Sequence, residues 1–269
     1  MILKAPWRYA KGIKNLQKKI MNFNFSDLKK DFSDKGFFIC KDVFKKEFIL
    51  GLIDEINSSK DTVKYFDNFN NLRRIEKLYD KGDLLKILND KISALLESIF
   101  EEKFLIFKDK FNAKPPGGEG FYAHYDGIFH FIDHDNNKRK GWYEYGEFFI
   151  NALVALDPCD EKNGTLEISK HHKGKFNDLL KNTKNDGTPA LSEIIESKLS
   201  FDSIMLNIGD IVIFSNTCPH RSKKNNSEKN RRVLYYTYTL SKNGSKYDQY
   251  FIDKEKSKNI SKALVEEKK

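Results

Sequence analysis

The stretch "NIGDIVIFSNTCPHRSKKNNSEKNRRVLYYTY", residues 207–238, decides the fold class. A Gly-Asp turn leads into a short apolar run, and a polar linker then leads to a second run rich in aromatic residues. Short runs of β-branched and aromatic residues bounded by turn formers are typical of β-strands. The stretch therefore predicts two strands, with His220 after the first and Arg231 at the start of the second.

Similar runs occupy the rest of the chain after Phe104: "FLIFKDKFNAK", "FYAHYDGIFHF", "EFFINALVALD" and "GTLEIS". Before Phe104 the apolar residues recur at helical spacing, as in "KKEFILGLIDEINSS" and "GDLLKILNDKISALLESIFEEKF". A short helix capped by Ser26 and a strand over residues 37–40 are also expected there. Many short strands after a helical opening predict a mainly β fold, with a closed or two-sheet core and flanking helices.

The chain is expected to form one large domain. Residues 1–24 are basic and weakly patterned and predict an arm, and residues 253–269 are charged and predict a tail that frays. Between them, residues 25–252 form the domain, with helical support over 25–103 and the β core over 104–252. Residues 173–200 interrupt the strands and are long enough to act as a lid.

Charge and cysteine content narrow the function classes. The net charge is +9, but only seven of the 48 basic residues are Arg. The basic residues are also scattered among acidic ones, and both features argue against nucleic-acid binding. A small anionic substrate is still favoured by such a field. No apolar run approaches the length of a membrane span. Three cysteines without metal-type spacing fit free thiols, so a cytoplasmic location is expected.

The segment "HYDGIFHFIDHD", residues 124–135, holds half of the chain's six histidines. His124 and Asp126 are two residues apart, so on a strand both side chains share a face and can reach one ion. His-x-Asp alone is weak evidence, since it often occurs by chance. A distant histidine such as His220 would complete a two-histidine, one-carboxylate metal site. Arg231, eleven residues later, could clamp a carboxylate of a 2-oxo dicarboxylic acid.

With these motifs in view, residues 25–250 resemble the phytanoyl-CoA dioxygenase family of Fe(II)/2-oxoglutarate oxygenases. The resemblance rests on pieces that occur in the family's order and spacing: "DKGFFICKDVF", "NAKPPGGEGFYAHYD", "VALDPCDEKNGTLEIS", "GDIVIFSNTCPHRS" and "NRRVLYYTY". It implies a double-stranded β-helix core, of the jelly-roll or cupin-like type. It also implies a hydroxylase that uses Fe(II), 2-oxoglutarate and O2 and releases succinate and CO2.

The resemblance further implies that His124, Asp126 and His220 bind the metal and that Arg231 binds the distal carboxylate of 2-oxoglutarate, assisted by Ser222. Arg232 is the competing choice, and only one of the two can point inward because successive strand residues face opposite ways. Lys108 and Asn112 are further candidates for the co-substrate site.

The other residues of the segment around the metal pair are assigned lesser roles. Its remaining polar residues are expected to shape the pocket mouth or meet solvent rather than bind metal: His130, Asp133, His134 and Asp135. The same is expected of His171 and His172. Five aromatic residues near the pair are candidate substrate contacts: Tyr122, Tyr125, Phe129, Trp142 and Tyr143.

The substrate is expected to be a small polar, anionic metabolite such as a phosphonate, an amino acid or a sugar acid. The sequence looks closest to family members such as 2-aminoethylphosphonate dioxygenases. Two alternatives stay open at this point. One is a non-catalytic binding protein on the same scaffold, and the other is a zinc hydrolase that uses the same three ligands.

Overall fold

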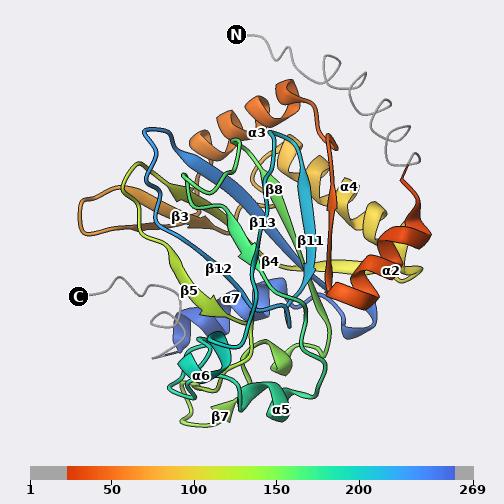
Figure 1. Ribbon diagram of the computed structural model, residues 1–269, viewed down its shortest axis with the longest axis vertical. Coiled ribbons are helices and arrows are strands. Elements are labelled where there is room, and N and C mark those ends of the chain that lie inside the picture. The colour runs from red at the N-terminus through yellow and green to blue at the C-terminus, as the bar shows by residue number, and fades with distance from the viewer. Residues whose placement is uncertain (1–22, 258–269) are drawn as a thin grey trace.

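The computed structural model describes residues 23–257 (Figure 1). The predicted arm over residues 1–24 lies outside this range except for its last two residues. The second of these, Asn24, caps the first described helix: its side-chain oxygen accepts from the amides of Ser26 and Asp27 at 3.2 and 3.5 Å. The predicted cap at Ser26 is therefore wrong by two residues, because Ser26 already lies inside the helix.

Two antiparallel sheets form the core. The larger sheet has seven strands, in the spatial order β1 (Phe37–Cys40), β11 (Ile211–Ser215), β8 (Phe149–Ala155), β13 (Arg231–Leu240), β4 (Phe104–Lys114), β3 (Leu72–Glu76) and β2 (Val63–Phe66). The smaller has four, in the order β10 (Asp202–Ser203), β9 (Leu166–Ile168), β12 (His220–Ser222) and β5 (Phe121–His124). A short hairpin joins β6 (Phe131–Ile132) to β7 (Lys138–Arg139). The expected double-stranded β-helix is confirmed.

Apolar residues on both faces of the larger sheet explain this arrangement. All seven residues of β8 are buried, which is typical of a strand covered on both sides. On one face, Leu153 and Val233 belong to the same apolar cluster as Leu166 and Ile168 of the smaller sheet. The other face packs against helices. The smaller sheet therefore covers the face of the larger sheet that the helices leave free.

Three helices cover the outer face of the larger sheet: α2 (Phe25–Lys35), α3 (Lys46–Ser58) and α4 (Asp83–Phe100) (Figure 1). The buried stripe on α4 follows the helical period predicted from the sequence: Leu84, Leu85, Leu88, Ile92, Leu95, Leu96 and Ile99. Burying one such side chain contributes on the order of 1.5–3 kcal/mol, so this stripe fixes the helix firmly on the sheet.

The support region 25–103 also contains a hairpin, β2–β3, that the sequence did not predict. It adds two strands to the larger sheet, with Arg74 opposite Asn112 and Ile75 opposite Phe111 of β4. The prediction of a helical region over 25–103 is therefore corrected. The run "LRRIE" is short and half polar, so its pairing depends on β4 and not on a local pattern.

Helix α7 (Tyr247–Lys256) corrects the predicted boundary at residue 252. It continues four residues into the predicted tail, because its buried residues include Lys254, which forms a buried ion pair with Glu76. The remaining short elements are α5 (Phe176–Leu180), α6 (Glu193–Glu196), η1 (Gly141–Glu144) and η2 (Ser241–Asn243). Helices α5 and α6 both lie in the 173–200 segment, and most of that segment is turn and loop.

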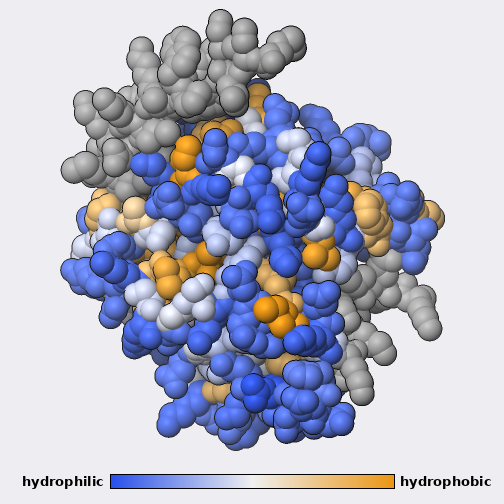
Figure 2. Space-filling model, turned by 180° about the vertical axis from the view of Figure 1, so that it is seen from behind, coloured by the Kyte–Doolittle hydropathy of each residue, from blue (hydrophilic) through white to orange (hydrophobic). Residues whose placement is uncertain are grey.

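The face in Figure 2 is mostly polar, with its apolar residues in small scattered groups. Between residues 23 and 257, no helix combines the length and the apolar character needed to cross a membrane.

Candidate active site

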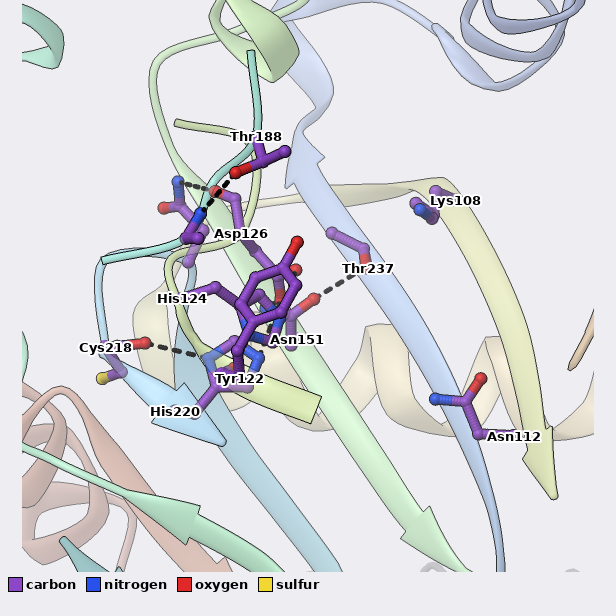
Figure 3. A network of polar contacts seen from close by, with 12 residues as sticks. Lys108, Asn112, Tyr122, His124, Asp126, Asn151, Thr188, Cys218, His220 and Thr237 are labelled. Atoms are coloured by element: carbon purple, nitrogen blue, oxygen red, sulfur yellow. Dashed lines mark hydrogen bonds and ion pairs between the residues drawn. The ribbon is translucent and has the colours of Figure 1, made fainter. Parts of the chain in front are cut away.

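Three side chains converge where β5 and β12 pair. His124 is the last residue of β5, and its Cα partner in the ladder is His220, the first residue of β12. Asp126 follows two residues after His124. One possible ligand atom from each residue lies within 4.8 Å of the others (Figure 3). This is the only such group of metal-ligating side chains found in the described part of the chain.

The backbone orients both imidazoles toward the same point. His124 Nδ1 donates to the carbonyl of Tyr122 at 2.8 Å, and His220 Nδ1 donates to the carbonyl of Cys218 at 3.0 Å. A carbonyl can only accept, so in each ring the proton sits on Nδ1 and the lone pair on Nε2. The Nε2 atoms lie 4.0 and 3.7 Å from the carboxylate oxygens of Asp126. Such a donor set and its fixed tautomers are what a metal ion requires.

A second set of contacts holds the carboxylate. Asn151 of β8 donates its amide to Asp126 Oδ2 at 2.9 Å, and Thr237 of β13 donates to Asn151 Oδ1 at 2.7 Å. Asn216 donates to the backbone carbonyl of Asp126 at 3.1 Å. These contacts tie the smaller sheet's carboxylate to the centre of the larger sheet, so its position is fixed before anything binds.

The local electrostatics keep the three groups in metal-binding form. Burial, together with the neighbouring His220, lowers the pKa of His124 to about 3, and burial also lowers the pKa of His220. Burial alone would raise the pKa of Asp126, but Lys110 and the two histidines hold it at about 2. Neutral imidazoles beside an ionised carboxylate are the ligand forms that divalent metals bind.

A cavity opens beside this cluster, lined by residues of both sheets. Arg231 lines it and is 4% exposed; its Nη2 donates to the carbonyl of Gly164 at 3.2 Å, while its buried Nε has no hydrogen-bond partner. Arg232 faces away and forms a two-point ion pair with Asp157, at 2.7 and 2.8 Å. Of these two neighbouring arginines, strand alternation therefore leaves Arg231 facing the cavity with a free donor.

Ser222 also lines the cavity, next to a lysine that the sequence reasoning missed. Lys114 is buried opposite Arg231 in the β4–β13 ladder, and its ammonium donates to Ser222 Oγ at 2.8 Å. Burial and the neighbouring Arg231 lower the pKa of Lys114 to about 6. Ser222 is thus held in place by a side chain from the facing sheet.

The two further co-substrate candidates on β4 separate. Asn112 lines the cavity, but Lys108 does not. The ammonium of Lys108 donates to the hydroxyl of Tyr250 at 3.1 Å and lies 5.4 Å from the ring centroid of Trp142, so aromatic side chains cover it. Figure 3 places both residues away from the three-residue cluster.

Three of the five predicted aromatic contacts line the cavity: Tyr122, Phe129 and Trp142. Tyr125 and Tyr143 do not, and those two predictions are corrected. Tyr125 lies between His124 and Asp126, so strand alternation turns it to the opposite side, where its hydroxyl bonds to Asn182 and His172. Tyr143 packs beside it in a separate apolar cluster.

The polar residues that were expected not to bind metal lie outside the three-residue cluster in the described part of the chain. His130, Asp133, His134 and Asp135 are absent from the cluster, and so are His171 and His172. His134 pairs with its neighbour Asp135 at 3.1 Å in an exposed position.

The cavity also contains residues that the sequence reasoning did not single out. Arg74 reaches it from the unpredicted hairpin, Lys110 from β4, Tyr235 from β13 and Tyr250 from α7. The rarity of Arg in this Lys-rich sequence was one signal that could have pointed to them. Three of the seven arginines line this cavity. Arg is selected where a planar, two-point donor is needed.

The 173–200 segment contributes one residue to the cavity wall. Pro189 lines the cavity, and its carbonyl accepts from the amide of Tyr125 at 3.2 Å. Leu191 donates its amide to the carbonyl of Ala123 at 2.8 Å. The segment therefore pairs with the edge of β5 next to the cluster.

Comparison with known proteins agrees with this geometry. The family model described as Phytanoyl-CoA dioxygenase (PhyH) matches residues 40–233, which is more than half of the chain. A 2-aminoethylphosphonate dioxygenase from an uncultured bacterium is 28% identical over 200 residues, which cover 71% of this chain and 70% of that protein. A methylphosphonate hydroxylase from Gimesia maris is 28% identical over 169 residues, which cover 62% of this chain and 57% of that protein.

Solved structures share the fold. The non-haem α-ketoglutarate-dependent carbocyclase SnoK of nogalamycin biosynthesis is 11% identical with a TM-score of 0.63, covering 82% of this chain and 85% of that one. EctD from S. alaskensis, solved with 2-oxoglutarate and 5-hydroxyectoine, is 15% identical with a TM-score of 0.62, covering 82% and 79%.

Proposed function

The chain belongs to the phytanoyl-CoA dioxygenase family, and from that premise we propose that this dioxygenase hydroxylates an unactivated C–H bond of a small polar, anionic metabolite. Fe(II) is its metal, and 2-oxoglutarate and O2 are its co-substrates. The observation that carries the proposal is one cavity that joins a His–Asp–His cluster to a buried arginine with an unsatisfied donor.

His124, Asp126 and His220 hold the metal in this proposal. Two neutral imidazoles and one carboxylate suit Fe(II), and three protein ligands leave coordination positions open for co-substrates. Asn151 orients the carboxylate through its 2.9 Å hydrogen bond, and this contact also keeps Asp126 from turning away.

Arg231 takes the distal carboxylate of 2-oxoglutarate, assisted by Ser222. The unpaired buried Nε of Arg231 supports this assignment, because a buried donor without a partner costs about 1–3 kcal/mol unless a ligand satisfies it. When bound, iron with 2-oxoglutarate and O2 supplies the oxidation of the C–H bond, with succinate and CO2 as the expected co-products.

The chain's own residues then bind and orient the substrate. Tyr122, Phe129 and Trp142 provide an apolar wall beside the metal cluster, which excludes water and presents one face of the substrate to the metal. The cavity walls also carry Arg74 and Lys110, which favour an anionic substrate.

The charge of the cavity wall and the names of the relatives support the proposed substrate class. Both curated relatives described above are named for organophosphonates, and the cationic wall of the cavity fits a phosphonate. An amino acid or a sugar acid carries a carboxylate that the same wall would accept.

The three cysteines are buried and unpaired, in keeping with the proposed cytoplasmic location.

A metabolite panel tests the proposal. Purified protein is incubated with Fe(II), 2-oxoglutarate and single phosphonates, amino acids or sugar acids, and succinate is measured above the background without a substrate. We expect a phosphonate to give the largest increase and a hydroxylated product by mass spectrometry. Absence of any iron-dependent succinate, with every member of the panel and without one, would refute the proposal.

A further inference from the structure

Arg74 is a buried cation whose charge the protein does not fully neutralise. It is 5% exposed, lies on the cavity wall, and its Nε donates to Asn112 Oδ1 at 3.4 Å. Its buried Nη1 makes no hydrogen bond, and the nearest carboxylate oxygen, Glu76 Oε1, is 3.8 Å away. An arginine buried in this way costs stability unless a ligand completes its contacts.

Glu76 cannot neutralise Arg74 on its own, because it already serves other groups. Its Oε2 accepts from the buried ammonium of Lys254 and from the hydroxyl of Tyr65. Lys108 is a further buried cation in the same electrostatic neighbourhood. One carboxylate therefore faces three cationic side chains, Arg74, Lys108 and Lys254, and of these three Arg74 lines the cavity.

Lys110 adds a second cation on the same wall. It lies two residues from Asn112 on β4, so both side chains share the inner face of the sheet. Its ammonium lies 4.5 Å from the ring centroid of Tyr235. Within residues 23–257 the ammonium makes no hydrogen bond and no ion pair, and its charge acts on Asp126 from a greater distance. Asn112 accepts through Oδ1 and keeps its amide nitrogen available as a donor.

This group is separate from the proposed 2-oxoglutarate site. Arg74 is on β3 and Arg231 on β13, and β4 lies between them, so the two backbones are roughly 10 Å apart. The third cavity arginine, Arg221, is already paired with Glu167 and Glu196 at 2.7 and 2.8 Å. Two anion-binding positions with unused donors are thus left in one cavity.

We propose that Arg74, Lys110 and Asn112 bind the anionic head of the primary substrate, and that this head is a tetrahedral oxyanion of the phosphonate type. The inference rests on the proposed function and deepens it by assigning the substrate-specificity residues. A guanidinium, an ammonium and an amide offer donors from different directions, which matches three oxygens on one phosphorus. Two cationic groups also match a dianionic head better than a single carboxylate.

Binding measurements without turnover test the site. The protein is loaded with Mn(II) and 2-oxoglutarate in the absence of O2, and methylphosphonate or acetate is titrated in by calorimetry. Variants Arg74→Met and Lys110→Met remove one cation each. The matched control is Arg73→Met, the neighbouring arginine, which does not line the cavity and donates to the carbonyls of Ala113 and Glu119 at 3.3 and 2.8 Å.

We expect wild-type protein to bind methylphosphonate more tightly than acetate. Each cavity variant should weaken methylphosphonate at least about tenfold while changing the 2-oxoglutarate dissociation constant less than about threefold, because each removes one charge-assisted contact. Arg73→Met should bind methylphosphonate as the wild type does. If Arg74→Met fails to fold, as a melting curve would show, Lys110→Met decides the outcome.

Three results overturn the proposal. The first is that wild-type protein does not bind methylphosphonate. The second is that the cavity variants bind methylphosphonate as tightly as the wild type does. The third is that Arg74→Met weakens 2-oxoglutarate binding as strongly as it weakens methylphosphonate binding, which would place Arg74 in the co-substrate site. Failure of the proposed function looks different. Wild-type protein would then not bind 2-oxoglutarate in the presence of Mn(II). Titration of metal-free protein with methylphosphonate would still measure whether Arg74, Lys110 and Asn112 bind the anion.

Discussion

Replacing Arg231 by Ala should raise the dissociation constant of 2-oxoglutarate and leave the fold intact. Among the residues that the structure describes, the side chain makes one hydrogen bond, to the carbonyl of Gly164, and that carbonyl keeps a second donor in Lys114 at 3.1 Å. The loss therefore falls on the ligand. A buried two-point contact between a cation and a carboxylate is worth roughly 2–5 kcal/mol, which corresponds to a roughly 30- to 4,000-fold weaker affinity.

The neighbouring arginine supplies the matched control. Arg232 pairs with Asp157 and its side chain is 30% exposed, so Arg232→Ala should cost at most about 1 kcal/mol of unfolding free energy and leave 2-oxoglutarate binding unchanged. Arg231→Lys should recover part of the loss, because an ammonium keeps the charge but not the planar fork. The assay is calorimetric titration of 2-oxoglutarate into Mn(II)-loaded protein without O2. A large effect of Arg232→Ala together with none of Arg231→Ala would refute the reasoning.

Three further predictions concern the metal cluster. His124→Ala, Asp126→Ala and His220→Ala should each abolish iron-dependent succinate formation with little change in the melting temperature, whereas His134→Ala, in an exposed position, should retain activity; equal damage from His134→Ala would contradict the ligand assignment. Asn151→Ala should weaken Fe(II) binding about 10- to 100-fold, measured by competition with a chelator, because Asp126 loses the amide that orients it; unchanged affinity would remove Asn151 from the site. Wild-type enzyme in chloride buffer should give no chlorinated product by mass spectrometry, because the carboxylate of Asp126 occupies the position that a chloride would need, and a chlorine isotope pattern would count against that role.

Much of the architecture was predictable because its signals are local. The strands after Phe104 carry β-branched and aromatic runs bounded by turn residues, and α4 carries its apolar residues at the helical period. Local spacing also predicted that His124 and Asp126 share one face, since the two-residue period of an extended chain needs no knowledge of the partner strand. The same period required that only one of Arg231 and Arg232 face inward.

The resemblance to the family favoured Arg231 over Arg232, but the strand period by itself did not choose between them. Alternation says that they face opposite ways but not which one faces the cavity, and the ion pair of Arg232 with Asp157 decides it. The prediction that Tyr125 contacts substrate failed for a similar reason. Tyr125 lies between two cavity residues in the sequence, but alternation along the chain turns its side chain to the opposite side.

The sequence by itself therefore determined the fold class, the helix and strand periods, and the motif pieces that resemble the family. The tertiary structure alone decided which cations meet in the cavity. Arg74 reaches it from a hairpin whose pairing depends on β4, and Tyr250 reaches it from a helix predicted to be partly a frayed tail. The physical reason is that strand pairing and helix docking are long-range contacts, and their energy comes from surfaces far apart in the chain, so no local pattern records which side chains they bring together.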